Sequence, residues 1–136
     1  MPAEAKGTSQ KSAKAFVRYY IDVLNFATAT GDTGTALRLS SPNCDSCSGM
    51  LDKIQDVYSQ GGYFRGEGWT VTDIKYQPLQ SDVKPILTIG IQLADQDMLE
   101  HADGKVKHFE GGPNRLTLHL ASKRSRWLVT QLDRLS

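Results

Sequence analysis

The spacing of apolar residues changes near Trp69, and this change constrains the fold more than any other feature. Before Trp69, apolar residues recur at steps of three and four, which is typical of one face of an α-helix. The clearest stripe lies in residues 12–30 and predicts a long helix there; Gly31 then ends it as a left-handed stop. The stripe comprises Ala13, Phe16, Val17, Tyr20, Ile21, Leu24, Ala27 and Thr28.

Two further helices are expected before the change in spacing. Asp32 is a candidate N-cap for a short helix over residues 33–39. Pro42 then breaks the chain, because proline has no N–H and disfavours helix in the preceding residue. A third helix is predicted over residues 44–60, capped by Asn43 or Asp45. Residues 61–68, four of them glycine, are interpreted as a flexible aromatic loop.

After Trp69 the spacing becomes two, which predicts strands with one buried face. A first strand is expected over residues 69–76 with a kink near Asp73, followed by a turn-rich connection over 77–85. Asp103-Gly104 is a strong hairpin signal. Residues 110–113 predict a bulge or bend. Residues 122–125 predict a turn, and a last strand is expected over residues 127–132. Strict alternation marks two main strands, at Leu87, Ile89, Ile91 and Leu93, and at Leu116, Leu118 and Leu120.

Helices followed by strands predict an α+β domain in which the helices pack on one face of a curved antiparallel sheet, forming a cone with a hollow. The length of 136 residues suits one such domain, expected over 12–136 after a flexible tail at 1–11.

The net charge of +1 argues against a nucleic-acid partner, and no apolar run approaches the roughly 20 residues of a membrane span. Lys123, Arg124 and Arg126 are read as a solvated turn rather than a phosphate-binding patch.

The two cysteines, Cys44 and Cys47, form a C-x-x-C pair at a predicted helix start. A structural disulfide is favoured over a redox couple, because the thioredoxin-like motif follows a strand and this pair follows a Pro-Asn break. No metal site is expected: zinc needs further ligands, and His101 and His108 lie outside the usual finger spacing. No cofactor is predicted.

Six residues are candidates for binding a ligand, each with a plainer structural alternative. The aromatic residues either line the mouth of the hollow or belong to the core. The face of the strand that carries Arg115 and His119 either lines the hollow, where the pair holds an anion, or faces water. The candidates are Tyr19, Tyr20, Trp69, Tyr76, Arg115 and His119.

No catalytic residue is assigned, because no serine lies in a G-x-S-x-G elbow. Asp22 and Asp73 are possible bases only by analogy with isomerases on a similar fold, and one fold hosts many functions. Whether the domain is an enzyme therefore stays open, with a non-catalytic role favoured.

Three stretches together resemble a family of uncharacterised actinobacterial lipoproteins, over roughly residues 13–75. They are residues 15–33 (AFVRYYIDVLNFATATGDT), 44–47 (CDSC) and 58–62 (YSQGG) continuing to Gly66 and Trp69. The resemblance implies a cone similar to nuclear transport factor 2-like, cystatin-like and polyketide-cyclase-like domains. It also implies an extracytoplasmic location, with a lipidated cysteine upstream of this sequence as the membrane anchor. The resemblance implies no activity, because none is established for the family.

Together these observations favour a non-catalytic cell-envelope domain that binds a small ligand or a protein partner. The alternatives are a cone-pocket enzyme of isomerase, cyclase or hydratase type and, more weakly, a thiol–disulfide protein. A homodimer through the outer face of the sheet is a further expectation.

Overall fold

The N-terminal half of the chain is helical, as the spacing predicted. The structure is a computed structural model that describes residues 9–77, 84–124 and 126–135. Helix α1 begins earlier than expected because the Ser9 hydroxyl accepts a hydrogen bond from the Ser12 N–H at 3.0 Å and caps it. It ends at Gly31, whose φ of 81° is left-handed as predicted. The helices are α1 (Gln10–Thr30), α2 (Gly34–Leu39) and α3 (Asp45–Ser59).

The cap of α3 differs from the prediction. Cys44, and neither Asn43 nor Asp45, is the N-cap: its Sγ accepts a hydrogen bond from the Cys47 N–H at 3.2 Å. Cys44 and Cys47 form the predicted disulfide, and both are buried. The bridge therefore joins the break after α2 to the first turn of α3.

The strands form two antiparallel sheets, one with the order β1-β4-β5 and one with the order β2-β3-β6-β7. The loop predicted over residues 61–68 is wrong in its first part, because residues 61–65 form strand β1 and pair with β4. Residues 1–8, 78–83, 125 and 136, which include most of the expected tail and part of the expected connection, lie outside the described residues. The strands are β1 (Gly61–Arg65), β2 (Trp69–Tyr76), β3 (Ile86–Leu93), β4 (Gln96–His101), β5 (Lys107–Phe109), β6 (Gly112–Lys123) and β7 (Arg126–Leu135).

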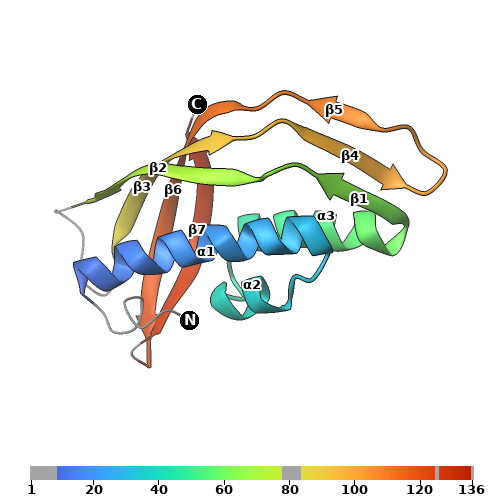
Figure 1. Cartoon of the computed structure of the whole chain (residues 1–136). Coiled ribbons are helices and arrows are strands. Elements are labelled where there is room, and N and C mark those ends of the chain that lie inside the picture. Colours follow the sequence, from blue (N-terminus) through green and yellow to red (C-terminus); the bar gives the residue numbers. More distant parts are fainter. Residues whose placement is uncertain (1–8, 78–83, 125, 136) are drawn as a thin grey trace.

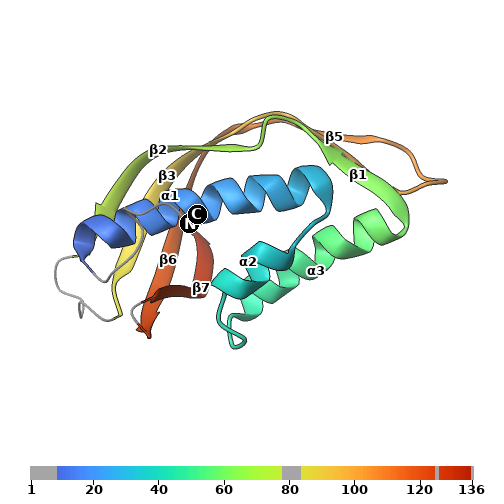
Figure 2. The same cartoon turned by 60° about the horizontal axis from the view of Figure 1, so that its bottom comes forward.

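The two sheets continue one another across a bend. Figure 1 shows β1, β4 and β5 prolonging β2, β3 and β6, and Figure 2 shows the bend from the side. At the bend the Ala94 N–H donates to the Gly68 carbonyl at 3.0 Å, so adjacent strands stay joined. Gly68 has a φ of 86°, and a Cβ there would lie 2.5 Å from Asn25 Oδ1, so glycine is required at this point.

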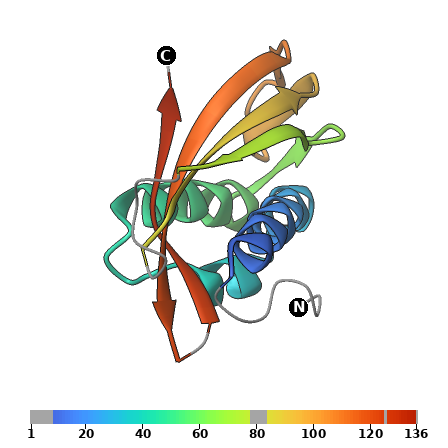
Figure 3. The ribbon, with the colours of Figure 1, turned by 90° about the vertical axis from the view of Figure 1, so that its left-hand side faces the viewer.

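The core lies between the helices and the four-stranded sheet, which curves around α1 (Figure 3). Leu116, Leu118 and Leu120 face the helices and are buried, as are all the predicted stripe residues of α1 except Thr28. The predicted kink in the first strand is confirmed as a register shift between Val71 and Asp73. The α+β class predicted from the order of helices and strands is confirmed. In the described part of the chain, no helix is both long and apolar enough to cross a bilayer.

Candidate functional site

A cavity of about 210 Å³ lies where α1, α3 and the bend between the two sheets meet. Its walls are largely apolar: Leu24 comes from α1, Met50 and Ile54 from α3, and Phe64 and Trp69 from the strands on either side of the bend. The remaining lining residues are Asn25, Thr28, Lys53, Gly68 and Gln96.

Asn25 shapes the wall of this cavity. Its side-chain amide donates from Nδ2 to the Trp69 carbonyl at 2.8 Å and accepts from the Trp69 N–H at 2.9 Å. The amide thus provides hydrogen-bond partners for both the N–H and the carbonyl of Trp69, at the point where β2 begins after the bend. Trp69 is therefore bonded directly to α1. Asn25 is not part of the apolar stripe of α1, and only a long-range contact reveals its role.

Tyr58 on α3 bonds the backbones of two residues that line the cavity, Thr28 and Phe64. Its hydroxyl donates to the Thr28 carbonyl at 2.6 Å and accepts from the Phe64 N–H at 3.3 Å. Because the partners lie on α1 and β1, this hydroxyl joins α1 to the three-stranded sheet. The backbone beside the cavity is therefore held by side chains from both long helices.

Lys53 is the one ionisable side chain among the cavity's lining residues. Its Nζ donates to Glu100 Oε1 at 3.0 Å, and the two side chains are 55% and 39% exposed. The hydrogen bond from Lys53, together with the charge of Lys107, lowers the pKa of Glu100 below its usual value. The charge of Lys53 is thus paired with that of Glu100.

The polar side chains that line the cavity differ in whether they already form hydrogen bonds within the protein. The amide of Asn25 is bonded to Trp69, and the Thr28 hydroxyl donates to the Leu24 carbonyl at 2.9 Å. Among the described residues, no group hydrogen-bonds the side-chain amide of Gln96 on β4. The site therefore offers a partly open, mainly apolar cavity with one amide free to bond a polar group of a ligand.

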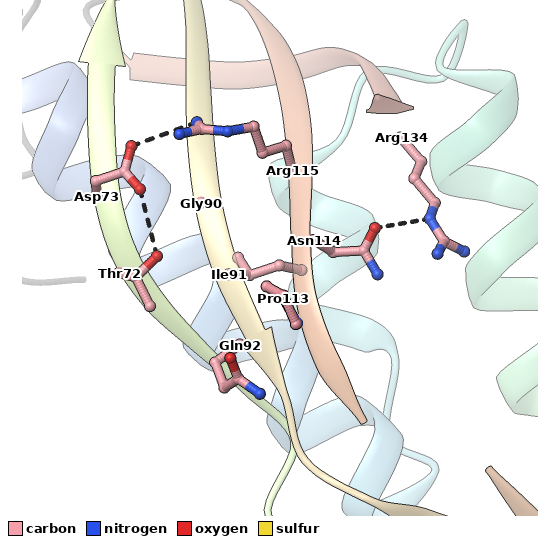
Figure 4. A pocket seen from close by; sticks show the side chains of 9 residues that line it. All are labelled: Thr72, Asp73, Gly90, Ile91, Gln92, Pro113, Asn114, Arg115 and Arg134. Atoms are coloured by element: carbon pink, nitrogen blue, oxygen red, sulfur yellow. Dashed lines mark hydrogen bonds and ion pairs between the residues drawn. The ribbon is translucent and has the colours of Figure 1, made fainter. Parts of the chain in front are cut away.

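A second depression, of about 630 Å³, lies at the start of β6 and extends over the solvent-facing side of the four-stranded sheet (Figure 4). Asp73 on β2 and Arg115 on β6 face one another across Gly90 of the strand between them. Arg115 Nη1 lies 3.5 Å from Asp73 Oδ2, with both side chains over 40% exposed. The pair meets because Gly90 has no side chain: a Cβ there would lie 2.2 Å from Asp73 Oδ1.

At the edge of the same depression, Arg134 donates to Asn114 Oδ1 at 2.8 Å (Figure 4). The Asp73 and Arg115 charges are paired with each other in an exposed setting, where ion pairs contribute about 0–1 kcal/mol. This depression is wide and open, and six of its nine lining residues are polar or charged. The inner cavity is smaller and less open, and half of its lining residues are apolar or aromatic, so it is the better candidate for a small molecule.

A model of a family of unknown function, DUF6318, matches residues 1–132 of the chain. The chain belongs to DUF6318. A comparison with curated proteins finds no significant sequence match for this DUF6318 domain.

Solved structures similar to the DUF6318 domain confirm the predicted cystatin-like fold. The intermembrane space region of the chloroplast protein ARC6 has a TM-score of 0.60 at 10% identity, covering 94% of this chain and 97% of that one. An uncharacterised protein with a cystatin-like fold from Caulobacter vibrioides has a TM-score of 0.57 at 9% identity, with 90% and 89% covered. The association domain of C. elegans CaMKII has a TM-score of 0.53 at 11% identity, with 91% and 95% covered. At these identities the likeness concerns the fold alone.

The structure does not gather the predicted ligand-binding aromatics of the DUF6318 domain at one mouth. Trp69 lines the inner cavity. Tyr20 is fully buried in the core and its hydroxyl bonds the Ser40 hydroxyl at 2.8 Å; burial raises the pKa of Tyr20 and the bond to Ser40 opposes this. Tyr19 lies in a separate groove beside α2, and Tyr76 packs, half-buried, at the far end of β2.

Arg115 and His119 lie on the face of β6 opposite to the buried leucines, so they do not line the hollow. Asp22 lies exposed on α1, in a groove beside β2, and Asp73 is on the outer sheet face; neither lines the inner cavity. Among the described residues, no group of three or more His, Cys, Asp or Glu is placed to hold a metal ion. The outer face is also where a second copy was expected, and the homodimer stays a prediction.

Proposed function

We propose that this DUF6318 domain is a non-catalytic binding module of the cell envelope whose inner cavity holds a small, mainly apolar molecule. The supporting observation is the composition of the wall: five apolar or aromatic side chains, with a single ionisable one that is already paired with Glu100. Apolar walls of this kind bury the surface of a bound ligand, and a few polar groups at fixed positions orient the ligand. The free amide of Gln96 is the group that would orient the ligand.

The size of the cavity limits the class of ligand. Sites for drug-sized molecules span roughly 300–1,000 Å³, so about 210 Å³ suits a smaller molecule. An apolar cavity of roughly 150 Å³ accommodates a benzene ring. A single aromatic ring or a short acyl chain carrying one hydroxyl, carbonyl or carboxylate group therefore fits.

The envelope location is part of the proposal. A disulfide persists in oxidising compartments, and Cys44 and Cys47 form one. The resemblance to lipoproteins in residues 13–75 supports tethering through a lipidated cysteine upstream of this sequence.

Ligand-observed NMR with p-cresol and with octanoate tests the proposal. Met50→Trp should abolish binding because the indole fills the cavity, whereas Met50→Leu should retain it as the matched control. Gln96→Leu should weaken p-cresol by roughly 5- to 10-fold, the cost of one lost hydrogen bond. Equal binding of both probes to wild type and Met50→Trp, in folded protein, would place them elsewhere and refute the proposal.

A further inference from the structure

Four cationic side chains from two distant parts of the sequence border one groove. Arg38 comes from α2, Lys123 ends β6, Arg124 lies in the turn that joins β6 to β7, and Arg126 begins β7. Figures 1 and 3 show α2 and this turn at the same end of the molecule. The groove has a volume of about 470 Å³, and its other lining residues are Leu37, Ser40, Pro42 and Leu128.

Within the part of the chain that the structure describes, no acidic side chain lines this groove. Among the described residues, none of its four cations forms an ion pair; Arg38 donates only to the neutral Thr35 hydroxyl, at 3.0 Å. All four residues are exposed. Since the whole chain has a net charge of only +1, this end concentrates positive charge, and a concave surface lined by one sign of charge attracts ions of the other.

The backbone at the turn is consistent with a requirement for charge. Arg124 has a φ of 52°, the left-handed region that glycine adopts at lower cost. The turn thus carries a long cation at the position where glycine would be the more stable residue.

A second groove, of about 310 Å³, adjoins the first and shares Arg38 and Arg126 with it. Tyr19, which is half-buried, adds aromatic surface to this second groove, and Thr35 adds a hydroxyl, whereas Trp127 behind them is buried. The two grooves together therefore offer a cationic part and, beside it, a partly aromatic part.

We propose that these joined grooves bind a phosphate ester, with the phosphate group among the four cations and the organic part against Tyr19. Guanidinium groups match phosphate oxygens in paired hydrogen bonds, and three of the four cations are arginines. Several unpaired cations suit a dianion or a cluster of phosphodiesters better than one carboxylate. The phosphate ester is supplied either by lipid headgroups or by a soluble metabolite.

Two binding assays separate these sources. One measures sedimentation of the domain with phosphatidylglycerol vesicles, and the other an NMR titration with glycerol 3-phosphate. Arg38→Gln/Arg126→Gln should weaken the observed interaction by roughly 30-fold, if each cation contributes about as much as a basic residue near an anionic surface. Lys75→Gln/Lys105→Gln, which removes the same charge at exposed sites elsewhere, should change it less than twofold.

Arg124→Gly distinguishes a loss of binding caused by the missing charge from one caused by misfolding. Glycine readily adopts the φ of 52°, so only the cation is lost. This variant should remain at least as stable as the wild type and still bind several-fold more weakly. Binding to vesicles alone identifies lipid headgroups as the source, and binding to glycerol 3-phosphate identifies a soluble ester. Absence of wild-type binding in both assays, or an equal loss in the Lys75→Gln/Lys105→Gln control, would overturn the proposal.

Discussion

The side-chain amide of Asn25 forms two hydrogen bonds with the backbone of Trp69, at 2.8 and 2.9 Å, and so joins α1 to the start of β2. Asn25→Ala should destabilise the domain by about 1–3 kcal/mol, because it leaves two part-buried backbone groups without their partner. Urea unfolding measures the change. Asn25→Asp keeps the acceptor and loses the donor, so its loss should be smaller; a loss below about 0.5 kcal/mol for Asn25→Ala would show that water replaces the amide.

Helix α1 offers a matched pair of phenylalanines. Phe16 is fully buried against the core, and Phe26 on the same helix is 51% exposed. Phe16→Ala should lower the free energy of unfolding by about 3–5 kcal/mol, as expected for a core aromatic residue. Phe26→Ala should lower it by less than about 1 kcal/mol. Similar losses for both variants, measured by thermal or urea unfolding, would mean that the buried face of α1 is misassigned.

The edge strand β5 is attached to β4 partly by a pH-dependent contact. His108 Nδ1 lies 2.7 Å from Asp97 Oδ1, and this hydrogen bond, aided by the nearby carboxylates, raises the pKa of His108 above its usual value. A raised folded-state pKa means that the contact stabilises the fold below about pH 6.5, the unfolded value, and that this contribution is lost as pH rises through the folded pKa.

Imidazole chemical shifts followed by NMR against pH measure this effect. Asp97→Asn should lower the pKa of His108 more than Asp95→Asn does, because Asp97 supplies the hydrogen bond and Asp95 a weaker charge at 3.9 Å. An unchanged titration of His108 in Asp97→Asn would disprove the contact.

The disulfide between Cys44 and Cys47 should be stabilising and unreactive under native conditions, since both residues are buried. Closing so short a loop contributes about 2 kcal/mol by the chain-entropy relation. Cys44→Ser/Cys47→Ser should lower the stability by roughly that amount without unfolding the domain. Oxidatively prepared protein, once unfolded in denaturant, should show no free thiol; two reactive thiols would contradict the bridge.

Sequence spacing predicted the elements whose signals are local. The stripe that includes Phe16 and Tyr20, the left-handed stop at Gly31 and the alternation around Leu118 all depend on neighbours along the chain, and the structure has them as predicted. Strand β1 was missed because glycine is rare in strands, yet Gly62 lies so close to the Leu99 carbonyl that only glycine fits.

The candidate site was less predictable because it depends on contacts between residues far apart in sequence. Trp69 was identified as a binding aromatic, but its partner Asn25 lies 44 residues away and is not part of the apolar stripe of α1. Arg38 likewise joins the basic turn only through the packing of α2. Spacing alone gave no means of choosing which face of β6 would line the hollow, and the structure places Arg115 and His119 outside it.

The inner cavity has walls on both sides of the bend: Phe64 and Gln96 belong to the three-stranded sheet, while Trp69 begins the four-stranded one. Its width is therefore governed by the angle between the two sheets as well as by side-chain size. A slight tilt of β1 and β4 relative to the four-stranded sheet would enlarge or close the inner cavity while leaving the packing around Phe16 undisturbed. Relatives sharing the same lining residues would then admit molecules of different bulk if their bends differ.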